Sequence, residues 1–290
     1  MKKAITLVIM AGGSSSRFGA CKQLQPMGPA GELLLEYALY DARAAGFTGA
    51  VIVIRSEMEA EFRRRLSSWA GGFRVDFAFQ EGAGNAGKRR RPWGTAHALL
   101  ACRDSLATPF AILNADDLYG REALASVFGH LSGASGHCVT GFPLGGTLSE
   151  QGSVSRALLH VDGDGMLASV EELHAVRRRA DGSIRDERSG ALLSPADLIS
   201  LNLWGFQPEI FPLMEAEFSR FVAARGRDDS AELPIPTAVS ALCRQGIPIR
   251  VIAAAATSWC GVTYKEDLQA VRRAVLGLHA HGAYPTPLAR

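Results

Sequence analysis

The chain has 290 residues, of which 47% are hydrophobic and 21% charged, and its net charge is +2 at pH 7. This balance is typical of a globular protein with a sizeable core, and it excludes a strongly basic nucleic-acid or membrane-surface binder. The five cysteines are odd in number and form no CxxC pair, which argues against a disulfide framework or a structural zinc site. No run reaches the roughly 18 apolar residues of a membrane helix.

The start of the chain has two interpretations. Met1-Lys-Lys3 followed by the apolar run Ala4–Met10 superficially resembles a signal peptide, but the run is short for one and equally consistent with a first strand. We favour the strand. Because the scattered cysteines suit a reducing compartment, we expect a cytoplasmic protein.

Strands and helices alternate through the first part of the chain. Short apolar runs predict buried strands and apolar spacing near 3.6 predicts helices. The strands are expected at Ala4–Met10, Ala50–Ile54, Phe73–Phe79 and Pro109–Asn114, and the helices at Gly31–Ala45, Ser56–Ala70 and from Thr95 to about Cys102. This alternation predicts a parallel sheet with right-handed crossovers.

The second part is less regular. Strands are expected at His137–Phe142, Val154–Val161, Met166–Leu173, Ile199–Phe206 and Ile247–Ala254, and helices at Pro212–Ala224 and Thr263–Leu278. The charged segment Arg177–Ser194 is expected to be an exposed excursion. No linker separates two domains, so we expect one domain over 1–290, with a nucleotide-binding half (about 1–135), an acceptor-binding half (about 136–260) and a closing helix and tail (261–290).

The loop after the first strand is rich in glycine, serine and cations. Its unobstructed backbone N–H groups, with Arg17 and Lys22, suit an anionic phosphate chain. The P-loop pattern fails, because Arg17 or Phe18 stands where its second glycine belongs, and the adjacent glycines exclude GxGxxG. From these residues alone, a plain strand–helix connection stays an alternative.

The segment Met10-Ala-Gly-Gly-Ser-Ser-Ser-Arg-Phe-Gly19, followed by Lys22-Gln-Leu24, resembles the signature of the sugar-1-phosphate nucleotidyltransferases. The resemblance implies a Rossmann-like three-layer α/β sandwich with a mixed, mostly parallel central sheet. It also implies that the backbone of Ala11, Gly12 and Gly13 contacts base and phosphate. Arg17 and Lys22 would be catalytic cations that neutralise the triphosphate and the leaving pyrophosphate.

Gln80 and Gly94-Thr-Ala-His97 resemble the base-recognition residues of the same family. A glutamine amide both donates and accepts hydrogen bonds, so it suits the edge of a pyrimidine. A glycine at a helix start lets a base approach the backbone. Gln80, Gly94 and Thr95 are therefore candidate nucleotide-binding residues, although a lone glutamine is more often a surface residue, and His97 is expected to pack on its helix.

Asn114-Ala-Asp-Asp-Leu-Tyr-Gly120 follows a buried apolar strand, where ligand sites of parallel sheets collect. The family places a Mg²⁺-binding aspartate here, and Asp116 matches it. Asp117 could instead cap the following helix. The family's second metal ligand precedes the last helix; Thr263 stands at that point, which leaves Asp267 as an alternative ligand or as a residue favoured by the helix dipole.

Three residues in the acceptor half resemble sugar-binding positions of the family: Gly152 in Gly152-Ser-Val-Ser-Arg156, Glu171 in Val170-Glu-Glu172, and Asn202 in Leu201-Asn-Leu-Trp-Gly205. Taken singly, each is an ordinary surface or turn residue.

The chain departs from the family where many members carry Lys-Pro after the acidic pair, because Leu173-His174 stands there. This leaves the ligand of the acceptor phosphate open among Arg156, His174, Arg177 and Lys265. The basic run Lys88–Arg91 is expected to be a solvated loop, with closure over the triphosphate as the alternative.

The resemblance implies a Mg²⁺-dependent enzyme that joins a nucleoside triphosphate, with a pyrimidine base, to a sugar 1-phosphate and releases pyrophosphate. Two alternatives stay open: a non-sugar acceptor such as phosphocholine or a polyol phosphate, and a degenerate regulator that binds nucleotide-sugars without turnover. The expected partners are these small molecules, with no nucleic acid and no membrane. The sequence does not define the oligomeric state.

Overall fold

The computed structural model describes residues 3–13, 22–70, 73–80, 92–133, 136–254 and 259–288. The helices are α1 (Leu34–Ala45), α2 (Glu59–Leu66), α3 (Thr95–Leu100), α4 (Arg121–Gly133), α5 (Ile210–Arg225), α6 (Ile235–Arg244) and α7 (Asp267–Ala280). The strands are β1 (Thr6–Met10), β2 (Gly49–Ile54), β3 (Arg74–Phe79), β4 (Phe110–Asn114), β5 (Asp117–Leu118), β6 (His137–Pro143), β7 (Val154–Val161), β8 (Leu167–Arg178), β9 (Ile184–Asp186), β10 (Leu192–Leu193), β11 (Leu198–Phe206), β12 (Ile249–Ala253) and β13 (Cys260–Gly261). Arg17 and the run Lys88–Arg91 lie outside the described residues.

Most strands belong to one mixed sheet. The strands β3, β2, β1 and β4 are adjacent and parallel, as the alternation of strands and helices predicts. From β4 the sheet continues through antiparallel β11 to β7, β8, β9 and β10. On its other edge β11 pairs with β6, which pairs in parallel with β12. The expected mixed sheet with parallel core strands is confirmed.

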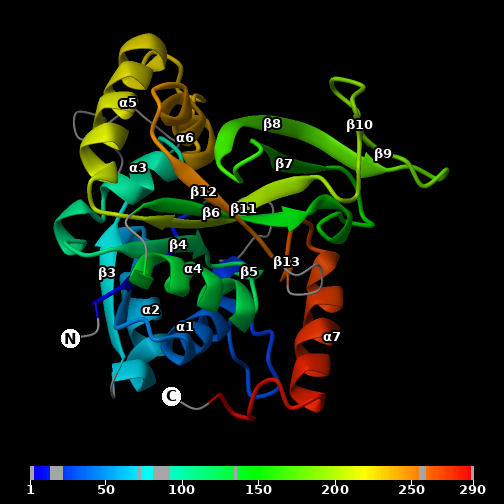
Figure 1. The fold of residues 1–290 in the computed structure, drawn as a ribbon. Coiled ribbons are helices and arrows are strands. Elements are labelled where there is room, and N and C mark those ends of the chain that lie inside the picture. The colour runs from blue at the N-terminus through cyan, green and yellow to red at the C-terminus, as the bar shows by residue number, and fades with distance from the viewer. Residues whose placement is uncertain are drawn as a thin grey trace.

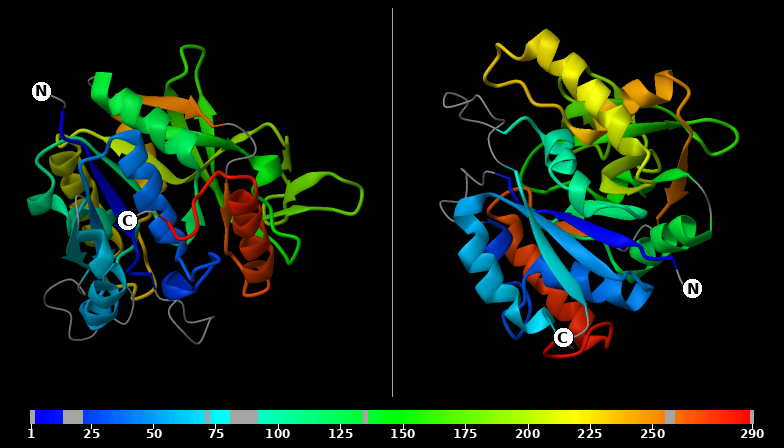
Figure 2. Two further views of the ribbon diagram at one scale, coloured as in Figure 1. Left: turned by 90° about the horizontal axis from the view of Figure 1, so that it is seen from below. Right: turned by 90° about the vertical axis from the view of Figure 1, so that its left-hand side faces the viewer.

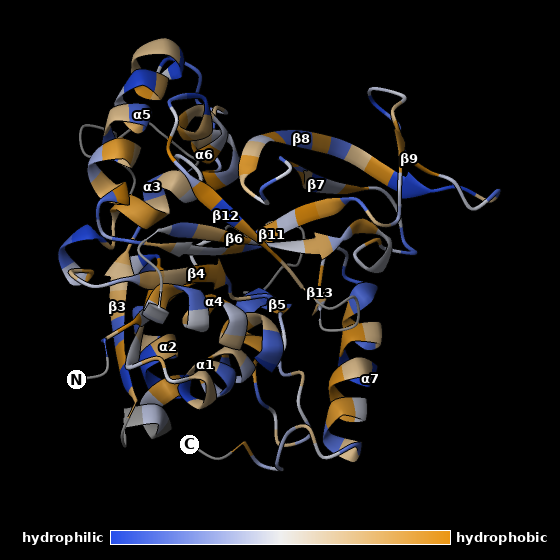
Figure 3. Cartoon of the chain, in the orientation of Figure 1, coloured by the Kyte–Doolittle hydropathy of each residue, from blue (hydrophilic) through white to orange (hydrophobic). Residues whose placement is uncertain are grey.

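Helices cover both faces of the sheet (Figure 1). The side chains of β1 alternate between two apolar clusters: Leu7 and Ile9 pack with α1, α2 and α4, whereas Val8 packs with α3, α5 and α6. This period of two is what a strand buried on both faces requires. The hydropathy colouring shows apolar residues along the strands and apolar residues alternating with polar ones along the helices (Figure 3). The three-layer arrangement is therefore confirmed. None of the helices in the described ranges is long and apolar enough to cross a membrane.

The segment Arg177–Ser194, expected to be an exposed excursion, is largely exposed and also contains strands. β8 continues to Arg178, and β9 and β10 add to it in an arm that projects from the sheet (Figure 1). Asp186 stabilises the arm, because its carboxylate accepts hydrogen bonds from the backbone N–H groups of Ala175 and Ser189. The expected exposed excursion is thus confirmed, and its short strands were not predicted because polar hydrogen bonds, rather than an apolar pattern, hold them.

The C-terminal segment returns to the first helix (Figure 2). After α7, the buried Tyr284 donates a hydrogen bond to Asp41 of α1 (2.7 Å), and the backbone N–H of Leu288 donates to Glu32 (3.2 Å). Tyr284 and Leu288 also belong to a third apolar cluster, which includes Tyr37 of α1 and Val271 and Val275 of α7. The C-terminal segment is therefore packed against α1 and α7.

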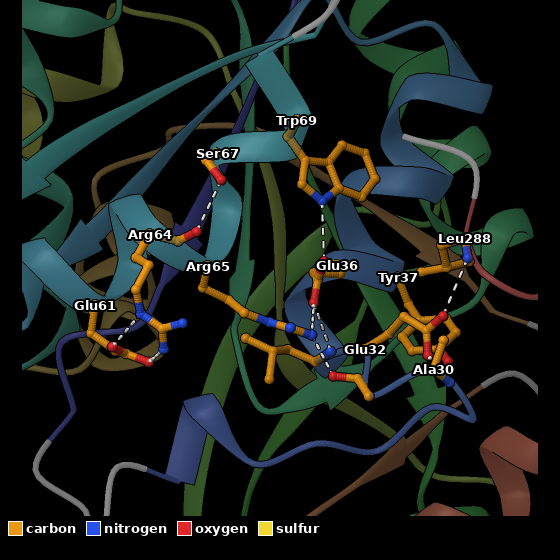
Figure 4. Close-up of polar contacts among 12 residues, drawn as sticks. Ala30, Glu32, Glu36, Tyr37, Glu61, Arg64, Arg65, Ser67, Trp69 and Leu288 are labelled. Atoms are coloured by element: carbon orange, nitrogen blue, oxygen red, sulfur yellow. Dashed lines mark hydrogen bonds and ion pairs between the residues drawn. The ribbon is translucent and has the colours of Figure 1, made fainter.

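A buried carboxylate lies at the start of α1 (Figure 4). Glu36 is fully buried, and its oxygens accept hydrogen bonds from the backbone N–H of Leu33 (3.0 Å) and from the indole N–H of Trp69 (3.3 Å). Arg65 of α2 supplies the compensating charge at 2.6 Å. A buried carboxylate is tolerated only with such partners.

Replacing Arg65 should expose the cost of burying Glu36. We expect Arg65→Met to lower the free energy of unfolding by about 2–4 kcal/mol, because the carboxylate would keep its burial and lose its charge partner. Arg64→Met is the matched control: its partner Glu61 is exposed, so we expect a change below about 1 kcal/mol. Denaturant unfolding of both variants measures the difference, and equal losses would contradict the prediction.

Asp41 should make stability depend on pH. Burial raises the pKa of Asp41 to about 6, although the Tyr284 hydroxyl and Arg121 oppose the rise. A carboxyl whose pKa is higher in the folded state than in the unfolded state reduces stability as the pH rises between the two values. From pH 4 to pH 7, wild type should therefore lose about 2–3 kcal/mol that Asp41→Asn retains. Unfolding of both proteins at the two pH values tests this, and a pH-independent difference between them would refute it.

Candidate functional site

The carboxyl ends of the parallel strands meet at one edge of the sheet. Met10 at the end of β1 lies opposite Asn114 at the end of β4. The segments that follow also pair, because the backbone N–H of Ala115 donates to Met10 (3.0 Å) and that of Ala11 donates to Val53 at the end of β2 (2.8 Å). The glycine loop and the aspartates therefore leave the sheet side by side, as expected for ligand-binding ends of parallel strands.

An ion pair joins two of the predicted catalytic residues at this edge. The ammonium of Lys22 lies 2.5 Å from a carboxylate oxygen of Asp116, and it also donates to the carbonyl of Val262. The two side chains are 13% and 26% exposed, so the pair is open to a ligand while being shielded from bulk water. The third predicted catalytic residue, Arg17, lies outside the described residues.

Asp117 lies behind this pair. Its carboxylate accepts a hydrogen bond from the Asn114 amide (2.9 Å) and lies 3.2 Å from the Tyr119 hydroxyl. Burial, followed by the neighbouring charge of Asp116, raises the pKa of Asp117 above its ordinary value. Gly261 of β13 pairs with Asp117, and a Cβ at position 261 would overlap the carboxylate. The carboxylate therefore supports the site through Asn114 rather than capping α4.

A bulge in β11 brings Asn202 to the same place. The pairing of β11 with β6 shifts register between Ser200 and Trp204, and Asn202 has φ 64°, a left-handed conformation rare for residues other than glycine. Its amide donates to Asn114 (3.3 Å) and accepts from the indole N–H of Trp204 (3.3 Å). A strained, hydrogen-bonded residue of this kind is common at functional sites.

These residues border a pocket of about 370 Å³ between the two halves of the chain. Its lining includes Lys22, Asn114 and Asp116 from the first half and Glu172, Ser200 and Asn202 from the second. A larger hollow of about 590 Å³ lies beside β3 and α2, but no carboxylate lines it and it is remote from the strand ends. The polar pocket is the candidate site.

The predicted base-binding residues also come together. The amide of Gln80, which is buried at the end of β3, donates to the carbonyl of Gly94 (3.0 Å), and a Cβ on Gly12 would lie 3.2 Å from its carbonyl oxygen. Gly94 has φ 96°, and a Cβ there would lie 2.5 Å from the Leu233 carbonyl, so only glycine fits. Thr95 lines the pocket while its hydroxyl accepts the N–H of Ile235 (2.8 Å).

Gly13, the last described residue of the glycine loop, keeps its carbonyl within 3.4 Å of the Gln23 amide. The Gln23 side chain thus links the loop to the turn that carries Lys22.

Two of the three predicted acceptor-binding residues do not line the pocket. The Glu171 side chain is half exposed and contacts His160 (3.1 Å), and the next residue, Glu172, lines the pocket instead. Burial raises the pKa of Glu172. Gly152 packs against the ring of Tyr264, where a Cβ would lie 2.7 Å from the hydroxyl. Asn202 does line the pocket.

The carboxylates allow a limited metal site. Asp116 reaches the pocket, whereas Asp267 lines a neighbouring hollow and accepts hydrogen bonds from the N–H groups of Thr263 (3.0 Å) and Tyr264 (2.7 Å). Within the described residues there is no cluster of three or more His, Cys, Asp or Glu side chains that could hold a metal. Mg²⁺ commonly binds through one or two carboxylates and substrate phosphates, so Asp116 fits such an ion once a triphosphate is present.

Comparisons with known proteins agree with this geometry. Residues 7–146 match the model of the MobA-like NTP transferase domain, a range that contains Lys22, Gln80, Gly94 and Asp116. Residues 7–146 therefore form a nucleotidyltransferase domain. No curated protein sequence matches it significantly.

Two solved structures share the fold of this nucleotidyltransferase. The inositol-1-phosphate CTP transferase from T. maritima has a TM-score of 0.65 and 11% identity, over 95% of this chain and 99% of that one. A structure described as a glucose-1-phosphate thymidylyltransferase from Bacillus anthracis, in complex with a sucrose, has a TM-score of 0.66 and 14% identity, over 94% and 95%. At these identities the likeness establishes the fold of both halves.

Substitutions at Asn202 should change the free energy of unfolding according to how easily the new residue adopts a positive φ. We expect Asn202→Val to lower the free energy of unfolding by about 2 kcal/mol, because a β-branched residue is disfavoured at positive φ. Asn202→Gly should stay within about 1 kcal/mol of wild type, since glycine adopts this conformation freely. Denaturant unfolding compares the two, and a valine variant as stable as the glycine variant would contradict the strained bulge.

Proposed function

We propose that this nucleotidyltransferase transfers a nucleotidyl group from a pyrimidine nucleoside triphosphate to a sugar 1-phosphate, releasing pyrophosphate. The observation that carries the proposal is the Lys22–Asp116 pair in the lining of a pocket whose polar wall is formed by Glu172, Ser200 and Asn202. The ammonium of Lys22 suits phosphates, and the polar wall offers the carboxylate, hydroxyl and amide groups that hydrogen-bond sugar hydroxyls. We treat residues 1–290 as a single domain acting in the cytoplasm, where free thiols persist.

The reaction requires positioning more than acid–base chemistry. An oxygen of the acceptor phosphate attacks the α-phosphorus, the new P–O bond forms, and pyrophosphate leaves with the electrons of the bond that breaks. Because the attacking phosphate is already anionic near neutral pH, no general base is needed. The residues that lower the activation barrier are those whose fixed charges and hydrogen bonds position and neutralise the phosphate groups.

The predicted catalytic and nucleotide-binding residues have roles in this scheme. Lys22, oriented by Asp116 and Val262, neutralises phosphate charge, and we assign the same role to Arg17. The backbone of Ala11, Gly12 and Gly13, with Gln80, Gly94 and Thr95, holds the nucleotide. Asp116 would hold Mg²⁺ together with phosphate oxygens, and a bound Mg²⁺ would neutralise the charge of the leaving pyrophosphate.

A polyol phosphate is the second candidate acceptor. The observation in its favour is the similarity of fold to a transferase that acts on inositol 1-phosphate, together with Leu173-His174 in place of Lys-Pro. The polar wall of the pocket serves a polyol as well as a sugar, because both present several hydroxyls.

A pyrophosphate-release assay tests the proposal. The common nucleoside triphosphates are crossed with glucose 1-phosphate, inositol 1-phosphate and phosphocholine, with and without Mg²⁺. We expect Mg²⁺-dependent release with a phosphorylated sugar or polyol, and Asp116→Asn and Lys22→Met should each lower the turnover about 100-fold or more.

Asp76→Asn is the control, because Asp76 lies on β3 and pairs with Arg74 away from the pocket. Wild-type turnover in Asp116→Asn or Lys22→Met would overturn the assignment of the site. Binding of nucleotide without pyrophosphate release in the presence of any acceptor would favour the regulator instead.

A further inference from the structure

Arg156 is the cation that the acceptor half contributes to the pocket. Among the described residues, the cationic side chains in the lining are Lys22 from the nucleotide half and Arg156 from β7. The other candidates for the acceptor phosphate, namely His174, Arg177 and Lys265, are exposed and lie outside the lining. Of the four candidate ligands for the acceptor phosphate that the sequence leaves open, Arg156 is therefore the one that lines the pocket.

The guanidinium of Arg156 is held in a fixed orientation. Its Nε donates to the Thr147 hydroxyl (3.3 Å), one terminal nitrogen donates to the Ser155 carbonyl (2.8 Å), and the other donates to the Thr147 carbonyl. It also lies 5.5 Å from the centre of the Trp259 ring, in the range of a cation–π contact. These contacts leave further N–H donors of the planar group for a ligand.

The charge of Arg156 has no direct counter-ion in the described part of the chain. Its hydrogen bonds go to a hydroxyl and to backbone carbonyls, and Asp117 and Asp267 act on it only over longer range. Burial lowers the pKa of Arg156 to about 10, so the group stays protonated at neutral pH. Because buried charges in proteins are normally paired, such a cation facing a pocket suits an anionic ligand.

Arg156 lines two neighbouring cavities, so an anion bound to its guanidinium would lie where the two cavities meet. The guanidinium also lines the neighbouring cavity of about 290 Å³, which shares Trp259 and Thr263 with the main pocket. An anion here would lie in the same pocket as Asp116 and beside the polar wall that carries Glu172.

We propose that Arg156 binds the phosphate group of the acceptor, and so replaces the Lys-Pro lysine that the sequence lacks. The inference rests on the proposed transfer reaction. A guanidinium presents parallel N–H groups that match two oxygens of a phosphate, and Arg156 thereby holds the nucleophile by its non-attacking oxygens. Acceptors without a phosphate or similar anion should not bind.

Steady-state kinetics with each substrate varied separately tests the assignment. Arg156→Met keeps much of the apolar stem on Trp259 and removes the donors, and we expect it to raise the KM of the acceptor about 10- to 100-fold while the KM of the nucleoside triphosphate changes less than about twofold. Arg156→Lys retains the charge and should lie between wild type and Arg156→Met. Arg177→Met removes an exposed arginine of β8 and should match wild type. An unchanged acceptor KM in Arg156→Met, or an equal rise in both KM values, would overturn the proposal.

A binding measurement separates this inference from the proposed reaction. If wild type releases no pyrophosphate with any acceptor, the proposed function fails, and calorimetry with glucose 1-phosphate and inositol 1-phosphate still tests Arg156. Loss of binding in Arg156→Met, with thermal unfolding showing a folded protein, supports the assignment. Absence of any difference from wild type refutes it.

Discussion

The ion pair between Lys22 and Asp116 is the interaction on which the site depends. It joins the end of the glycine loop to the end of β4, and the second hydrogen bond of Lys22 adds the segment after β13. Segments far apart in the sequence thus meet at one ammonium group. Since a partly buried pair has lost much of its hydration, a triphosphate that arrives there competes with fewer water molecules for Lys22.

That the predicted nucleotide-binding residues lie together was largely predictable from the sequence. Apolar strands that end in glycine, glutamine or aspartate place these residues at one sheet edge, provided that the strands are parallel. The structure brings Gly12, Gln80 and Gly94 together, and it pairs Lys22 with Asp116. This succeeds because parallel βα units have one handedness and a common orientation, so local patterns determine long-range neighbours.

The acceptor side was less predictable, because irregular strand pairing decides which residues face the pocket. β7 and β8 shift register between Val154 and Arg156, and Glu172 lies opposite Ala157, so the inward carboxylate is Glu172 and not Glu171. A shift of one residue turns every side chain to the other face, and no local pattern shows it. The bulge at Asn202 and the buried contacts of Glu32 and Asp41 are similarly invisible, since their partners lie far away in the chain.

The shared strand β11 has a mechanical consequence. One edge of β11 follows β6, while its other edge is divided between β7 near Ser200 and β4 near Trp204. The nucleotide and acceptor walls are thus held by one continuous backbone, and rotating one half against the other would break its ladder of hydrogen bonds. A hinge requires a place where few contacts cross. The two walls of the pocket are therefore rigidly connected through β11. Any adjustment of the pocket to its ligands must come from movements of side chains and loops rather than from rotation of the two halves.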